Sequence, residues 1–410
     1  MIVKKKEIIN ISVVILTNLL VFLLDGSELI SDWSLYIIIT GIFFYLIRDF
    51  KNYGALGIII LVGGLVLYTF PYLGELLRGN RISPIFYTLF LLAALILFRM
   101  QAVISTIKTK EQKFNWLIPI LCALTISLIG LHIWPPIFSG FYAIGLIFLE
   151  RSCRNRSLSQ RQLFFHASFF YFVLLYYMMF VWSGFGRLYF LTYLILPLLI
   201  LFHYKIIKIR AWQLIFIAPF GLIYGTIIRG AETVQVDNFA GGSASHHLEL
   251  MEILRTSISN HVADLSKLID QFVLYFLNWY PREIWSNKPT GIGSWFVDEF
   301  IGREGFSDMH SVSLGLWGEH IYLNPDWWFL TGINTILITG LVSAMLYRAS
   351  LGSAAVLFMF QANLLTLFWG GLASFGSRAW WMVIPAIIYI WIEKLIKDAV
   401  ISHRSSVQRN

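Results

Sequence analysis

Apolar runs long enough to cross a lipid bilayer follow one another along most of this 410-residue chain. A hydrocarbon core about 30 Å thick needs about 20 helical residues, and backbone groups inside lipid must be hydrogen-bonded within the helix. Hydrophobic residues make up 58% of the chain and charged residues 13%, a balance that excludes an ordinary soluble domain. The sequence therefore predicts an all-α polytopic membrane protein with about twelve transmembrane helices. We expect them near residues 8–24, 33–48, 54–73, 82–98, 115–133, 137–149, 163–182, 188–203, 212–228, 327–347, 353–371 and 379–395. Because Pro135 and Pro136 precede a short sixth run, eleven or thirteen spans stay open.

Lysine and arginine fall in alternate loops between these runs. Three lysines, Lys4 to Lys6, precede the first run, and four arginines cluster between Arg151 and Arg161. Basic residues near the ends of spans keep a loop on the cytoplasmic side of the membrane. Both termini are therefore predicted to be cytoplasmic and residues 229–326 to lie outside. The net charge of +8 follows from this topology, and the sequence predicts no nucleic-acid partner.

The longest segment of mixed composition covers residues 229–326. It divides the chain into an N-terminal bundle of about nine spans (1–228), a large extracytoplasmic loop (229–326), and a C-terminal part of about three spans with a cytoplasmic tail (327–410). Long loops in compact proteins usually carry function, so we expect the active-site residues here. Within the loop, apolar residues from Met251 to Phe276 recur at spacings of three and four, which predicts one amphipathic helix.

Four arginines lie on the predicted outer side, against the positive-inside bias: Arg187, Arg229, Arg282 and Arg378. Arginine stays charged, and its planar fork pairs with two phosphate oxygens at once. Together with Lys288, these side chains predict a binding site for a lipid-linked phosphate or diphosphate. Each arginine taken alone is equally compatible with an interfacial anchor or with a partner for a nearby carboxylate.

Glu319 is the first candidate for a general base. It lies in a run of small and aromatic residues, 311–320, where partial burial would raise the carboxyl pKa toward the range useful for proton abstraction. A structural glutamate that pairs with an arginine is the alternative, and His310 is the second candidate base. Trp285 and Trp317 offer flat apolar faces on which sugar rings could stack, although packing of the loop would also use them.

Several motifs of known chemistry are missing from the sequence. It contains no glycine-rich phosphate loop, no HExxH, no GxSxG, and no DxD pair in the outer loop. ATP hydrolysis and zinc proteolysis are therefore disfavoured, and we predict neither a metal site nor a cofactor. Cys122 and Cys153 are predicted in a span and in a cytoplasmic loop, so no disulfide is expected. A metal-free transfer, in which arginines stabilise a phosphate leaving group, needs only the residue types present.

Three stretches resemble the Wzy-type O-antigen and oligosaccharide repeat-unit polymerases, which are membrane glycosyltransferases. They are Gly184 to Arg187 with the following Leu188 to Pro197, Pro281 to Pro289, and Ser311 to Asn324. The second is the most specific, because the family often has a proline, an arginine, a tryptophan and a lysine-proline pair at similar spacing. Pro325-Asp326 departs from the family pattern, in which an aromatic residue and a glycine are commoner.

This resemblance implies an enzyme at the outer face of a bacterial inner membrane that builds a surface polysaccharide. A growing glycan would move from one undecaprenyl diphosphate carrier to the non-reducing end of a new lipid-linked repeat unit. The implied partners are the undecaprenyl-diphosphate-linked donor and acceptor, membrane lipids and a chain-length regulator protein. In that reaction Glu319 would take the proton from the acceptor hydroxyl, and the outer arginines would divide the two diphosphates between them.

Three other functions stay open. An O-antigen ligase, which transfers glycan to a lipopolysaccharide core, would use the same arginines. A glycosyltransferase that uses a polyprenyl-phosphate sugar favours acidic residues in the first outer loop, where Asp25, Glu28 and Asp32 occur. A lipid-linked oligosaccharide flippase or transporter fits the number of spans, although such proteins usually have two similar halves and polar groups near the midplane.

Overall fold

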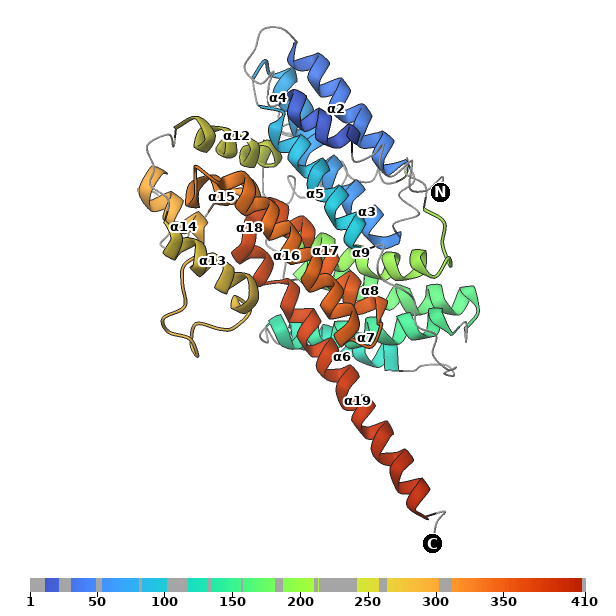
Figure 1. Ribbon diagram of the computed structural model, residues 1–410. Helices are drawn as coiled ribbons and strands as arrows, with labels where there is room; N and C mark the ends of the chain where they lie inside the picture. The colour runs from blue at the N-terminus through green and yellow to red at the C-terminus, as the bar shows by residue number, and fades with distance from the viewer. Residues whose placement is uncertain are drawn as a thin grey trace.

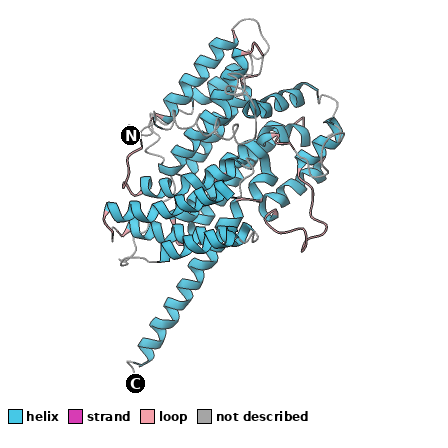
Figure 2. Ribbon diagram, turned by 180° about the vertical axis from the view of Figure 1, so that it is seen from behind, coloured by secondary structure: helices cyan, strands magenta, loops and turns pink. Residues whose placement is uncertain are grey.

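A computed structural model gives the fold of the protein. The structure describes residues 12–21, 31–48, 54–80, 83–101, 117–130, 135–155, 158–180, 187–209, 213, 242–257, 264–301 and 312–407. Within these ranges all regular secondary structure is helical (Figure 1, Figure 2). The predicted all-helical class is therefore confirmed for the part of the chain that the structure describes.

The N-terminal part is a bundle around one buried helical rod. The rod consists of α3 (Gly54–Gly64), a π-helical turn (Leu65–Thr69) and α4 (Phe70–Leu77). Of an apolar stretch of 18 residues within it, 89% is buried. Tyr68 of the rod stacks on Phe90 of the neighbouring helix α5 (Ile85–Gln101), with ring centroids 4.7 Å apart. The other helices of this part are Ser12–Val21, α2 (Asp32–Ile47), α5 (Ile85–Gln101), α6 (Leu117–Gly130), α7 (Pro135–Arg154), α8 (Gln160–Phe180) and α9 (Arg187–His203).

The C-terminal part holds a long helix, a bent pair and a second long helix. They are α16 (Trp328–Ala349), α17 (Ala354–Ala362) with α18 (Leu364–Gly376), and α19 (Ala379–Val407). The sequence predicted one span over 353–371, but α17 and α18 meet at Asn363 with a bend of 65°. The last turns of α19 project beyond the bundle, and the C-terminus lies at their tip (Figure 1).

The sixth predicted span, residues 137–149, lies within the longer helix α7, which begins at Pro135. Proline suits the first turn because the N–H that it lacks would have no partner there. The predicted ninth span, 212–228, lies outside the described residues apart from Gln213.

Length and apolarity identify only some of the twelve predicted spans within the described residues. Among the described residues, three helices meet both conditions, Gly54–Leu77, Trp328–Ala349 and Ala379–Ile401, and the bent pair makes a fourth if it counts as one span. Five shorter apolar helices accompany them. Several apolar helices are thus present, as expected of a membrane protein, while the count of twelve is not confirmed.

A cap of short helices lies at the end of the bundle away from the C-terminus (Figure 1). It consists of α12 (Gly242–Ser257), α13 (Leu265–Leu277), α14 (Ile292–Phe296) with a π-helical turn (Val297–Ile301), and α15 (Gly315–Leu323). The single amphipathic helix predicted from Met251 to Phe276 is wrong, because Asp264 interrupts it. Asp264 has an extended backbone, and its carboxylate accepts a hydrogen bond from the Lys267 N–H at 3.0 Å, so it starts α13 as an N-cap.

Candidate functional site

The candidate base lies on α15, a helix of nine residues that are all buried. It packs between α12, α16 and α18. Two glycines permit this close approach: Gly315 begins the helix with φ +71° beside the Phe368 carbonyl, and Gly318 faces the Met251 side chain. The sequence predicted Glu319 in a long outer loop. In the structure it lies on a short helix and is buried inside the protein.

Glu319 closes a break in the neighbouring helix α18. At Gly371 the chain leaves helical geometry with φ 75° and ψ −165°, and the next amide, the Leu372 N–H, donates to Glu319 Oε2 at 2.7 Å. A β-carbon at position 371 would overlap the Glu319 carboxyl group, so the break needs glycine for both space and conformation. The carboxylate replaces the carbonyl that this amide lacks at the break.

Burial sets the charge state of Glu319. It raises the pKa of this carboxyl group from 4.5 to about 8, and the Leu372 N–H opposes that rise by stabilising the anion. A carboxyl group with such a pKa exists in both protonation states near neutral pH, which suits a group that exchanges protons.

His320, the residue after Glu319, is a buried neighbour of the candidate base. Its Nε2 lies 2.9 Å from the Thr335 hydroxyl of α16, while its Nδ1 is buried and has no hydrogen-bond partner. Burial lowers the pKa of the imidazole from 6.5 to about 3. His320 is therefore neutral at physiological pH, and its position directly after Glu319 was the signal that could have drawn attention to it.

Trp317 packs inside the protein instead of offering a face to a sugar. Its side chain is 0% exposed, and its ring lies against Gly332 and edge-on to Trp328. A sugar cannot stack on this ring in the structure, so we leave Trp317 out of the proposed site. Trp285, the other predicted platform, is half-buried in the loop that follows α13.

The cations of that loop hold its backbone together. The Arg282 guanidinium donates to the carbonyls of Lys288 and Pro289 at 2.7 and 2.9 Å. Lys288 Nζ in turn donates to the carbonyls of Asn278 and Tyr280 at 2.6 and 2.8 Å. Arginine has five N–H donors and lysine has three, so both groups retain donors for a further anion.

The loop is tied to the same helix that Glu319 closes. Asn278 at the end of α13 donates from its side-chain amide to the Ala373 carbonyl at 2.6 Å, two residues after Gly371. The Asn278 carbonyl accepts from Lys288. Ala373 and Leu372 are adjacent in α18, so the candidate base and the cationic loop are joined through one short piece of backbone.

The structure describes only some of the other predicted site residues. Arg378 is half-buried between α18 and α19, at the end where the loop is attached, and it interacts electrostatically with Tyr177 of α8. Arg187 is the first residue of α9, and its side chain lies outside the described part. Arg229 and His310 also lie outside the described residues, as do Asp25 and Glu28 of the polyprenyl-phosphate alternative. The structure thus links Glu319 to Lys288 through the backbone of Leu372 and Ala373 and through Asn278, and it links Lys288 to Arg282.

In the ranges that the structure describes, no group of three or more His, Cys, Asp or Glu side chains could hold a metal ion. The chain matches no model of a known protein family, no curated protein and no solved structure. The likeness to Wzy-type polymerases therefore depends only on the stretches of sequence quoted for it.

Proposed function

We propose that this protein is a membrane glycosyltransferase that polymerises undecaprenyl-diphosphate-linked oligosaccharide repeat units at the outer face of a bacterial inner membrane. In this proposal the chain has about twelve spans, both termini are cytoplasmic and the cap faces outward. The observation that carries the proposal is the link through α18: a buried carboxyl group with a pKa of about 8 and a loop with two cations are fastened to adjacent residues, Leu372 and Ala373.

The chemistry is a single displacement. Glu319 takes the proton from a hydroxyl group of the acceptor sugar, and the hydroxyl oxygen forms a bond to the anomeric carbon of the donor glycan. The bond from that carbon to the diphosphate oxygen breaks, and the diphosphate leaves with the electron pair. Cations near the leaving group stabilise the negative charge that develops on it.

Arg282 and Lys288 fit this task because their own positions are fixed. A cation held by two backbone carbonyls is already oriented, so binding a diphosphate costs less side-chain entropy. Arg282 is exposed and keeps N–H donors beyond the two that bind the loop, and Arg378 supplies a further positive charge in this proposal. Arg187 and Arg229 belong to the same proposal.

Access to Glu319 requires a movement. The side chain is 1% exposed, so the acceptor reaches the carboxylate only when α15 and the break in α18 move apart. The Leu372 N–H then stays available to the carboxylate or to the acceptor oxygen. Closure of such a site would exclude water and protect the donor from hydrolysis.

The test uses purified protein and the lipid-linked repeat unit that accumulates in cells lacking this protein, without nucleotide or added metal. Mass-resolved glycan analysis should show a ladder of repeats for the wild type and for Glu252→Gln, a control on the surface of α12. Glu319→Gln should give no ladder. Its side-chain oxygen can still accept from the Leu372 N–H, so thermal unfolding should show a folded protein.

Two results would contradict the proposal at different levels. Absence of a ladder with folded wild-type protein, repeated with a lipopolysaccharide core acceptor, would remove polymerisation and ligation together. A wild-type ladder from Glu319→Gln would retain the activity but take the role of base away from Glu319.

A further inference from the structure

A second polar site lies at the opposite end of α16, far from Glu319. A pocket of about 340 Å³ opens between the C-terminal end of α7, the turn from α16 to α17, and α19. Four basic side chains line it, Arg151, Arg154, Lys394 and Lys397, against three acidic ones. The function proposed for the outer cap makes no use of this pocket.

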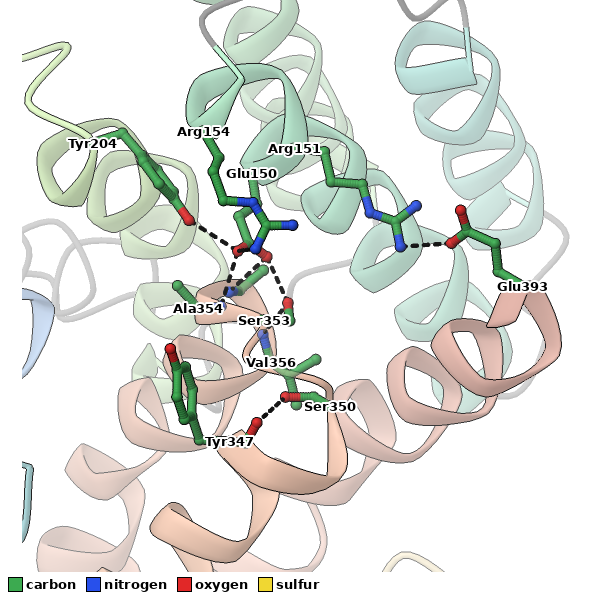
Figure 3. Close-up of polar contacts among 11 residues, drawn as sticks. Glu150, Arg151, Arg154, Tyr204, Tyr347, Ser350, Ser353, Ala354, Val356 and Glu393 are labelled. Carbon is green, nitrogen blue, oxygen red and sulfur yellow. Dashed lines mark hydrogen bonds and ion pairs between the residues drawn. The ribbon is translucent and has the colours of Figure 1, made fainter. Parts of the chain in front are cut away.

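Glu150, the most buried acid of the pocket, already has its partners (Figure 3). It is 1% exposed and accepts from the backbone N–H groups of Ala354 and Ala355 at 2.9 and 3.1 Å, from the Ser353 hydroxyl at 2.5 Å and from the Tyr204 hydroxyl at 3.0 Å. A carboxylate at the start of a helix satisfies amides that the helix leaves free. Glu150 thus anchors the first turn of α17 to α7.

These four donors leave little of Glu150 for its neighbour Arg154. The closest approach of the Arg154 guanidinium to Glu150 is 3.8 Å, from Nη1 to Oε1, which is too long for a hydrogen bond. Arg154 Nε is buried and has no hydrogen-bond partner. A buried, charged donor without a partner is unfavourable, and an anion in the pocket would supply the acceptor that Arg154 lacks.

Glu393, the second acid of the pocket, also has ion-pair partners (Figure 3). It pairs with Arg151 Nη2 at 2.5 Å and with Lys397 Nζ at 2.5 Å, so two cations share one carboxylate. Arg151 is further held near the rings of Phe148 and Tyr389, at 5.8 and 5.7 Å from their centroids. The lining of the pocket thus carries four basic groups against three acidic ones, Glu150, Glu393 and Asp398, which leaves one positive charge in excess. Lys394, one of the basic groups, lies over the Trp391 ring.

The rim of the pocket is apolar. Leu351 lies at the turn between α16 and α17 in the left-handed region, with φ 54°, and is 40% exposed. Glycine would occupy this conformation more easily, so the structure keeps an apolar side chain here at a conformational cost. Ile388 and Ile392 of α19, which lie between the pocket and the middle of the helix, are 52% and 51% exposed and continue an apolar surface toward the membrane interior. Cations inside and apolar groups at the rim match a molecule with an anionic head and hydrocarbon chains.

We propose that this pocket binds the phosphate group of an anionic phospholipid, with Arg154 as the principal donor and the acyl chains along α19. Its position at the end that carries the basic loops places the lipid in the cytoplasmic leaflet, where anionic headgroups attract Lys and Arg. The bound lipid would connect α7, the α16–α17 turn and α19. The proposal is independent of the reaction at the outer cap.

Native mass spectrometry of the detergent-solubilised protein tests it, with phosphatidylglycerol and phosphatidylcholine as probes. Arg154→Ala should weaken retention of phosphatidylglycerol about tenfold, as expected for the loss of one charge-assisted hydrogen bond. Arg348→Ala is the control, because Arg348 is an exposed arginine at the same end of α16 that does not line the pocket. If Arg154→Ala does not fold, Lys394→Gln takes its place, with an expected loss of about threefold.

The wild type should prefer phosphatidylglycerol to phosphatidylcholine, and Arg348→Ala should match the wild type. Equal retention in all variants, or an equal loss in the pocket and control variants, would overturn the site. Glycerol phosphate distinguishes the source of the phosphate. Failure of glycerol phosphate to displace the lipid supports the phospholipid, whereas displacement at low millimolar concentration would overturn the lipid and assign the pocket to a soluble phosphate compound.

Discussion

The carboxyl group of Glu319 lies over the α-carbon of Gly371, in the space that a β-carbon at position 371 would fill. The two residues belong to different helices, and the amide that follows Gly371 is bonded to Glu319 at 2.7 Å. The glycine therefore provides room for the acid, and the acid satisfies the amide that the break at the glycine exposes. Each residue depends on the other, which makes the pair testable from both sides.

Replacement of Gly371 by alanine should destabilise the protein markedly. The backbone conformation at φ 75° and ψ −165° is one that only glycine adopts easily, and it costs about 1–3 kcal/mol for another residue, before the displacement of Glu319 is counted. Thermal unfolding in detergent measures the loss. Gly41→Ala is the matched control, because Gly41 lies in α2 with nothing within 4 Å of an added β-carbon. That change should be neutral or stabilising by about 0.5–1 kcal/mol. Equal unfolding temperatures for the two variants would contradict the interdependence of Gly371 and Glu319.

Glu319 should make stability depend on pH between about 6.5 and 8. Its pKa is raised from 4.5 in the unfolded chain to about 8 in the folded protein, so the folded protein binds the extra proton. Stability should therefore fall as pH rises through this range and level off above it. The window begins at about 6.5 because His320, whose pKa is lowered from 6.5 to about 3, contributes the opposite slope below that pH. Unfolding temperatures of Glu319→Gln across the same range should be flatter than those of the wild type. Parallel curves for the two proteins would show that Glu319 does not titrate in this way.

Arg282 should protect the loop that it bridges. Removal of its two bonds to the carbonyls of Lys288 and Pro289 should cost about 0.5–1.5 kcal/mol per bond, mostly as local opening. Hydrogen exchange of the Ile284, Trp285 and Lys288 amides, which are bonded within the turn, reports on this opening. Arg282→Ala and Arg282→Lys should both exchange faster, because lysine keeps the charge but not the planar fork. Arg255→Lys on α12 controls for loss of an arginine elsewhere in the cap. Unchanged exchange in Arg282→Ala would mean that the loop does not need the bridge.

Glu150 should be essential for stability at the other end of the bundle. Glu150→Ala leaves two backbone amides, a serine hydroxyl and a tyrosine hydroxyl without their acceptor in a buried place. Each buried group without a partner costs about 1–3 kcal/mol, so a loss of at least about 2 kcal/mol is expected. Glu252→Ala, which removes an ion pair to Arg255 on the surface of α12, should cost less than about 0.5 kcal/mol. Thermal unfolding of the two variants compares these losses, and a small loss for Glu150→Ala would show that water replaces the carboxylate.

Local sequence determined the helical class and many helix ends. The apolar runs predicted where helices lie, since a chain in contact with apolar surroundings must bond its own backbone groups. Pro135 marks the first turn of α7, where proline fits without loss of a hydrogen bond. Asp264 could have been recognised as an N-cap from its residue type and from Ser266 and Lys267 after it, but the apolar periodicity from Met251 onward pointed to one unbroken helix.

Tertiary structure decided what the candidate residues do. Glu319 could be selected from its residue type and its neighbours, but its partner Leu372 lies 53 residues further along the chain. Glu150 accepts a hydrogen bond from Ser353, 203 residues further along the chain. Trp317 is excluded from sugar stacking by Gly332, on another helix. Periodicity and composition are local properties that can be read from the sequence. Burial, hydrogen-bond partners and pKa values depend instead on which distant segments pack together. That packing is set by all of the helix interfaces jointly, so it cannot be read from any one segment.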